Sequence, residues 1–156
     1  MARLFQTKAL VPILSSADIV SGVTCESIYV GRATHVTYLV MFGPSLSGNA
    51  ILTIYEGATD GATTSAITFH YTYGGAATAS ASSDVMEDES TSAALTCTGT
   101  TFVSRLLVIE YDMESMTDGY DWLTPVFDSS ASAGECTIVA VVDYKYPSPH
   151  DATLLS

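Results

Sequence analysis

Apolar and polar residues alternate with a period of two along much of this chain, which is the pattern of half-buried β-strands. Across residues 67–73 every odd position is aliphatic or aromatic and every even position is polar. Residues 135–146 repeat the alternation, and their second face begins apolar and turns charged at Asp143 and Lys145. Both segments are therefore predicted to be strands, the second one emerging from a core at its end.

Three further segments, 34–42, 50–56 and 102–112, are apolar on both faces over part of their length. This pattern is typical of central strands that are covered on two sides. A weaker strand is predicted over residues 24–30. Short loops rich in Gly and Ser separate these segments, and Asp60-Gly61 supplies the positive φ that a tight turn needs. The sequence thus predicts an all-β fold, an antiparallel β-sandwich of jelly-roll or immunoglobulin-like type.

Two segments lack a strand pattern. Residues 74–94 are rich in Gly, Ala, Ser and Thr and contain an acidic run at 84–89, which predicts a long surface excursion. Residues 113–121 have room for one helical turn that ends at Gly119, and we expect at most one such turn in the fold. We divide the chain into an N-terminal arm or edge segment (1–14), a sandwich domain (15–147) and a C-terminal tail (148–156).

Composition excludes several classes of protein. Five Lys and Arg stand against 17 Asp and Glu, which gives a formal charge of −12, so a phosphate-tracking nucleic-acid binder is excluded. With 47% hydrophobic residues the chain is too apolar for a disordered acidic protein. No apolar run approaches the roughly 20 residues of a membrane helix, and no signal-peptide layout is visible, so we expect no membrane partner and synthesis in the cytoplasm.

No motif for catalysis or for a cofactor is present. The chain has no nucleophile elbow, phosphate loop or zinc-protease helix, so we expect no catalytic residues and no cofactor. Its three cysteines show no metal-binding spacing, and we expect Cys25, Cys97 and Cys136 to be buried reduced thiols. His35 and His70 fall within strands and are expected to be ordinary strand residues.

Acidic side chains offer one alternative to this view. Asp112, Glu114, Asp118 and Asp121 cluster after a strand, and their oxygens could hold Ca²⁺. Their spacing is not that of an EF-hand loop, so we expect a solvated acidic loop and no metal, with the calcium site left as the alternative.

Aromatic side chains are the other candidates for binding. Tyr71, Tyr73, Tyr120 and Trp122 are expected at strand ends or in loops. Exposed Tyr and Trp are frequent in protein interfaces and sugar sites, because each combines apolar area with a polar atom. Packing at the edge of the core is the alternative interpretation.

Four stretches, taken in order, resemble a known group of proteins. They are residues 16–22, the hairpin 36–57 followed by Ala66-Ile-Thr-Phe-His-Tyr71, the segment 107–121, and Ile138-Val-Ala-Val-Val-Asp-Tyr-Lys-Tyr-Pro147. Their order and spacing resemble the small virion structural proteins of tailed bacteriophages, of the capsid decoration (cement) type. The resemblance covers nearly the whole chain.

This resemblance implies a function as well as a fold. It implies a β-sandwich without catalytic residues that binds the outer capsid surface, with the major capsid protein as partner and often as a trimer. The expected location is the virion, on the outer capsid surface. The alternative is a virion-borne module that binds host surfaces or carbohydrate, as a head fibre or tail component, through the four aromatics named above.

The N-terminal segment 2–14 combines basic and apolar residues, with Pro12 arguing against a central strand. We hypothesise that it is an arm that reaches a neighbouring subunit or the shell, and the alternative is a fraying tail. The candidate interface residues are Arg3, Leu4, Phe5, Lys8, Leu10, Val11 and Ile13. We further expect the acidic stretches at 84–89 and 112–121 to face solvent, away from the contact surface.

Overall fold

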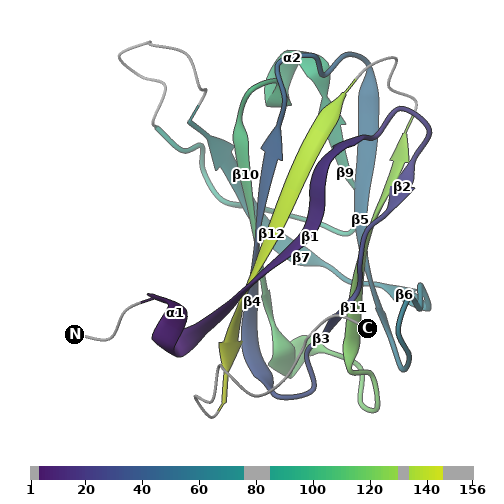
Figure 1. Ribbon diagram of the computed structural model, residues 1–156, viewed down its shortest axis with the longest axis vertical. Helices are drawn as coiled ribbons and strands as arrows, with labels where there is room; N and C mark the ends of the chain where they lie inside the picture. Colours follow the sequence, from purple (N-terminus) through teal and green to yellow (C-terminus); the bar gives the residue numbers. More distant parts are fainter. Residues whose placement is uncertain (1–3, 76–84, 130–133, 146–156) are drawn as a thin grey trace.

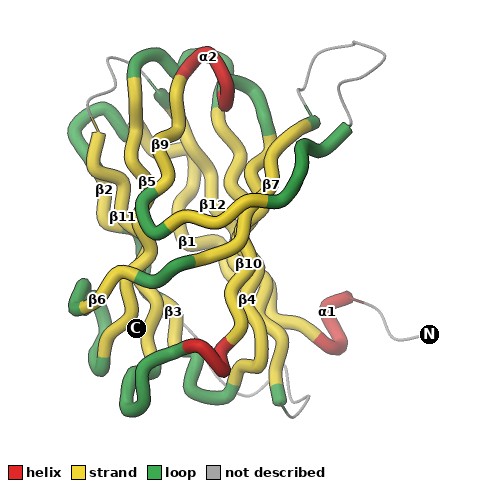
Figure 2. Tube along the Cα trace, turned by 180° about the vertical axis from the view of Figure 1, so that it is seen from behind, coloured by secondary structure: helices red, strands yellow, loops and turns green. Residues whose placement is uncertain are grey.

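The computed structural model describes residues 4–75, 85–129 and 134–145, which form two antiparallel sheets packed face to face (Figure 1). The predicted all-β sandwich is therefore confirmed. Figure 2 shows the same two layers from behind, with loops at both ends.

Sheet A has six strands. In spatial order they are β1 (Lys8–Asp18), β12 (Glu135–Tyr144), β4 (Ala33–Phe42), β10 (Leu106–Asp112), β7 (Phe69–Gly74) and β8 (Ser90–Ser92). All neighbouring pairs are antiparallel. The two ends of the chain's described part thus lie side by side at one edge of the sheet, as β1 on β12.

Sheet B is built around two long strands, β11 (Trp122–Ser129) and β5 (Asn49–Gly57). Short strands flank them: β2 (Val23–Thr24) and β3 (Ile28–Tyr29) pair with β11, while β6 (Ser65–Ala66) and β9 (Leu95–Thr98) pair with β5. Three single helical turns complete the described part, α1 (Leu4–Thr7), α2 (Gly99–Phe102) and the 3₁₀ turn η1 (Met113–Ser115). The turn predicted within 113–121 is η1, whereas α1 and α2 are two further turns that the sequence did not predict.

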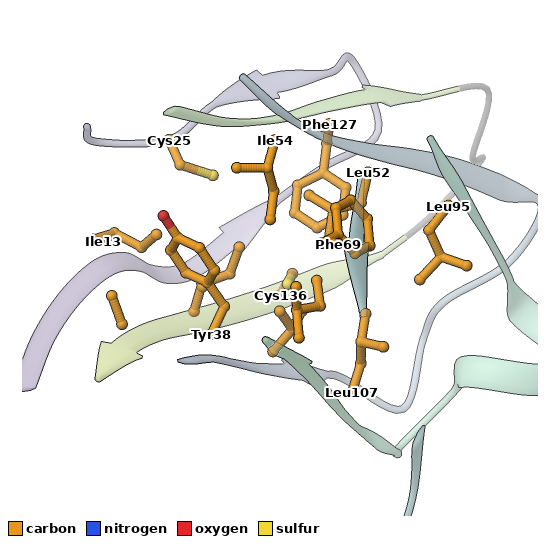
Figure 3. Packing of buried hydrophobic residues seen from close by; sticks show 14 of the residues in the cluster. Ile13, Cys25, Tyr38, Leu52, Ile54, Phe69, Leu95, Leu107, Phe127 and Cys136 are labelled. Atoms are coloured by element: carbon orange, nitrogen blue, oxygen red, sulfur yellow. The ribbon is translucent and has the colours of Figure 1, made fainter. Parts of the chain in front are cut away.

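The inner faces of the two sheets form one core. Phe127, Leu52 and Ile54 from sheet B meet Tyr38, Phe69 and Leu107 from sheet A, as Figure 3 shows. The aromatic rings of Phe42 and Phe127 approach edge to face, with centroids 6.2 Å apart across the two sheets. All three cysteines are buried and free, as predicted.

Two prolines occupy positions where no ladder hydrogen bond is lost. Pro12 lies in β1, at the edge of sheet A, opposite Val139. Pro125 lies within β11, where its carbonyl accepts a hydrogen bond from the Cys25 N–H on the side of β2 and β3 (2.9 Å). Because N–H and C=O of one residue point to the same side in an antiparallel strand, the missing donor faces the gap between these two short strands.

The predicted strands are confirmed with shifted bounds. The segment predicted at 24–30 is split into β2 and β3, and the one at 67–73 becomes β7. β11 and β9 were not predicted, because Pro125 and short Thr-rich runs interrupt the alternation. Residues 148–156 lie outside the described part.

The N-terminal segment divides into two parts. Residues 8–14 belong to β1, which continues to Asp18 and pairs with β12. Val11 and Ile13 point into the core and are buried. The prediction that these two residues contact a partner is therefore wrong, because their side chains already fill the space between the sheets.

Candidate functional site

The outer face of sheet A, which points away from sheet B, carries a continuous row of apolar side chains across four strands. Pro12 of β1 lies opposite Val139 of β12, Val139 opposite Leu39 of β4, and Leu39 opposite Val108 of β10. Side chains opposite each other on one face have Cβ atoms about 5 Å apart, so the row is in lateral contact. The rows above and below extend it, and we call the whole set the apolar band: Leu10, Pro12, Leu39, Met41, Leu106, Val108, Val139 and Val141.

The apolar band is open to solvent. Leu10 is 47% exposed and Met41 44% exposed, whereas Val141, which lies opposite Leu10, is buried. We predicted that 34–42 and 102–112 are covered on two sides; they are central strands, but no described element covers their outer face. Contiguous exposed apolar surface of this kind marks an interaction site more often than scattered single residues do.

The outer face of sheet B differs. Its exposed apolar residue Ile51 (38% exposed) lies opposite Thr96 on one side and Asp128 on the other. The neighbouring Thr53 also faces outward and is half-buried, whereas Thr124 is fully buried, with its hydroxyl 3.0 Å from that of Ser27. Isolated apolar residues among hydroxyls are ordinary surface, so sheet B offers a natural control for sheet A.

Charged side chains border the apolar band along β10, β7 and the segment before β8. His35 Nδ1 lies 2.7 Å from Asp112 Oδ1, and His70 Nδ1 lies 2.6 Å from Glu89 Oε1. Glu110 lies directly opposite His70 in the sheet, and its Oε1 is 3.9 Å from His35 Nε2. We call this group the acid–histidine flank.

A recess of about 240 Å³ lies within this flank. Val108 and Met86 contribute apolar lining, and Glu87, Glu89 and Glu110 contribute carboxylates. Arg105 is the nearest described Lys or Arg, with Nη1 4.0 Å from Glu87 Oε1 and its guanidinium carbon 5.8 Å from the centre of the Tyr73 ring. The recess therefore combines an apolar lining with an excess of negative charge.

The acidic stretches are not all remote from the candidate surface. Glu87, Glu89 and Asp112 are exposed to solvent, as expected, but they lie beside the apolar band and not away from it. Among the described residues, no three His, Cys, Asp or Glu side chains are grouped so that they could hold a metal ion.

Of the remaining N-terminal candidates, Lys8 and Leu10 lie on this face. Leu10 belongs to the apolar band, and Lys8 beside it forms an ion pair with Asp143 (2.7 Å). Leu4 lies in α1, which projects to one side of the sandwich, and is 54% exposed (Figures 1 and 2). Arg3 and the Phe5 side chain lie outside what the structure describes.

The four candidate aromatics do not share one surface. Tyr71 and Tyr73 lie on β7 opposite the inward-facing Ile109 and Leu107, and pack partly buried against the core. The Tyr73 ring lies 4.8 Å from that of Phe102. Trp122 is in β11 of the other sheet, 5.5 Å from Tyr29 in an edge-to-face arrangement, and Tyr120 lies in the loop before it. The structure thus brings Tyr71 and Tyr73 to the core edge and separates them from Trp122.

The buried thiols are poor nucleophiles. Burial, with a smaller contribution from Glu26, raises the pKa of Cys25 to about 12, and burial raises the pKa of Cys97 to about 12. Since the thiolate is the reactive form, neither side chain is suited to nucleophilic chemistry near neutral pH.

Comparison with protein-family models, curated proteins and solved structures finds no match to this chain. No helix among the described residues is long and apolar enough to cross a membrane. The function is therefore inferred from the fold and from the arrangement of surface side chains.

Proposed function

We propose that this chain is a structural protein of a bacteriophage virion, which decorates the outer capsid surface and stabilises the head by bridging capsid subunits. Its partner is the major capsid protein, and it acts as a homo-oligomer, with a trimer as the expected form. The observation that carries the proposal is the apolar band on the outer face of sheet A. The band is the surface that contacts the shell.

The physical properties of the band suit this role. It lies on a continuous six-stranded sheet, so the ladder already holds its backbone in place and no backbone ordering is needed on binding. A shell repeats the same site many times, so an oligomer that engages several sites at once binds far more tightly than one copy does. Binding only to the assembled lattice then raises the stability of the lattice.

The proposed role needs no catalysis. Both histidines on the outer face are paired with carboxylates, in His35–Asp112 and His70–Glu89. Cys25, Cys97 and Cys136 are buried, and burial raises the pKa of each thiol. We therefore propose a binding protein and not an enzyme.

The test uses heads assembled without this chain. The purified protein is added at increasing concentration, bound protein is measured by sedimentation with the heads, and the temperature of head rupture is recorded. We expect saturable binding at a fixed ratio to the capsid protein and a higher rupture temperature. Absence of saturable binding would overturn the proposal.

Two matched variants locate the contact. Met41→Glu places a charge in the apolar band, and Ile51→Glu places the same charge at a similarly exposed position on sheet B. We expect Met41→Glu to weaken head binding at least tenfold and Ile51→Glu to bind as the unchanged protein does. Equal binding by both variants would contradict the assignment of the band to the shell.

A second candidate function rests on Trp122. Its half-buried ring on the outer face of sheet B, next to Tyr29, has the exposed aromatic character of a sugar-binding position. A host-surface or carbohydrate-binding module would give a saturable signal on a glycan array that is lost in Trp122→Ala. The same array with Tyr73→Phe, which changes a residue at the core edge, serves as the control.

A further inference from the structure

We propose that the recess in the acid–histidine flank binds the N-terminal segment of a second copy of this chain, with Arg3 toward the carboxylates and Leu4 on the apolar lining. This contact joins the copies within the homo-oligomer that the proposed function requires. It rests on that function only in placing the contact on a shell, because the contact itself joins copies in solution.

The recess selects for a particular kind of side chain. Glu89, Glu110 and Glu87 line it with side chains that are 69%, 57% and 59% exposed, so all three can turn toward an incoming group. Val108 and the 37% exposed Met86 offer apolar contact next to them. A cationic side chain adjoining an aliphatic one satisfies both features, because the charge meets carboxylates while the aliphatic part covers apolar surface.

The N-terminal segment has this chemistry. Residues 1–8 contain Arg3 and Lys8 and no acidic residue, in a chain whose net charge is −12. The ammonium of Lys8 is engaged by Asp143, so Arg3 is the basic residue left in the segment for an outside partner. Leu4 follows Arg3 directly and is 54% exposed in a turn that projects from the sandwich (Figures 1 and 2).

The segment cannot reach the recess of its own chain. β1 and β7 are separated in sheet A by β12, β4 and β10, which is four strand spacings. At about 4.8 Å for each spacing, the two strands lie roughly 19 Å apart. The recess begins at β10, three spacings or roughly 14 Å from β1. Leu4–Thr7 form the helical turn α1, in which each residue advances about 1.5 Å, so Leu4 lies only about 6 Å along the chain axis from Lys8. The occupant of the recess is therefore a second copy.

The two contact elements lie at opposite edges of sheet A, with the segment on β1 and the recess on β10 and β7. A contact of this kind is head to tail: each copy donates its segment to one neighbour and accepts the segment of another. Such contacts close into a ring when the rotation between copies permits it. The ring covers Val108 and leaves the rest of the apolar band, mainly on β1, β12 and β4, free for the shell.

The test measures association of the purified full chain by sedimentation velocity over a concentration series, with no heads present. We expect concentration-dependent oligomers for the unchanged chain, and at least tenfold weaker association for Arg3→Glu and for Glu110→Lys. The chain carrying both changes regains association, because the charges are exchanged. Asp128→Lys, on the outer face of sheet B, associates as the unchanged chain does.

A mixture provides the decisive measurement. Arg3→Glu keeps an intact recess and Glu110→Lys keeps an intact segment, so each variant's segment fits the other's recess, once with the original charges and once with the charges exchanged. An equimolar mixture therefore regains the association that each variant alone has lost. Monomers at all concentrations of the unchanged chain, or variants that associate normally, would overturn the inference. Head binding plays no part in this measurement. Oligomers that form in solution but do not bind heads would support the inference and contradict the proposed function. A chain that binds heads but stays monomeric in solution would overturn the inference and leave the proposed function standing.

Discussion

Pro12 lies directly opposite Val139 across the outermost pair of strands in sheet A, and both side chains are on the outer face of the sheet. The pair starts the apolar row that continues through Leu39 to Val108. A proline at an edge strand also hinders the pairing of a further strand there. The edge is thus protected from strand addition, while the face beside it remains available for a partner.

Neighbouring positions in β10 should differ sharply in their contribution to folding. Leu107 is fully buried in the core, and Val108 is half-buried on the outer face. We expect Leu107→Ala to lower the free energy of unfolding by about 2–5 kcal/mol. Val108→Ala should lower it by about 1 kcal/mol or less, since it removes little buried area. Urea denaturation of both variants checks this, and similar losses would contradict the assignment of the two faces.

A buried carboxylate holds the loop before β11. Glu56, 4% exposed at the end of β5, accepts hydrogen bonds from the backbone N–H of Thr117 (3.0 Å) and from its hydroxyl. Thr117→Ala removes one donor and should lower the free energy of unfolding by about 1–3 kcal/mol. Thr117→Ser keeps the hydroxyl and should stay within about 1 kcal/mol of the unchanged protein in the same thermal melts. An unchanged free energy of unfolding in Thr117→Ala would show that the Glu56 carboxylate does not depend on the Thr117 hydroxyl.

The three thiols should be protected in the native state. Cys25, Cys97 and Cys136 are all buried, and burial raises the pKa of each thiol. At pH 8 we expect negligible reaction with a thiol reagent such as dithionitrobenzoate over minutes, and three equivalents after denaturation. Rapid labelling of one thiol in the folded protein would contradict its position in the core.

Alkaline pH should destabilise the fold through the same groups. The pKa of Cys97 rises from 9.0 in its ordinary state to about 12 when buried, so the folded protein holds this proton more tightly than the unfolded chain does. Its stabilising contribution is complete below pH 9 and is lost between about pH 9 and 12, at about 1.4 kcal/mol per pH unit. Denaturation at several pH values should show the free energy of unfolding falling with pH in this range. Cys97→Ala should reduce this slope by the contribution of one thiol. An unchanged slope in the variant would contradict the coupling.

The strands with the clearest alternation could be predicted from the sequence, whereas the candidate surface could not. β7 alternates without interruption, and β12 is apolar along one whole face, so the sequence of each strand indicates which face points to the core. β11 was not predicted because Pro125 interrupts its alternation. The strand tolerates this proline because the side of Pro125 that lacks an N–H faces the gap between β2 and β3. The apolar band depends on the register between strands, which brings Leu39 beside Val139 only after folding.

Apolar residues on both faces of 34–42 were the available signal for the band. Such a pattern fits a strand covered on two sides as well as it fits a strand whose outer face awaits a partner. The same ambiguity affects the N-terminal segment, where Leu10 and Val11 are adjacent and apolar yet point to opposite faces. Only the pairing of β1 with β12 separates core residues from candidate contact residues.

The orientation of the protein on the head tests the central claim most directly. Electron cryomicroscopy of heads saturated with this protein gives density in which the two sheets can be distinguished. We predict density at symmetry-related positions on the outside of the shell, with the outer face of sheet A, at Met41 and Leu106, against the capsid protein. Density confined to the tail, or a sandwich that meets the shell through the outer face of sheet B at Ile51, would contradict the account.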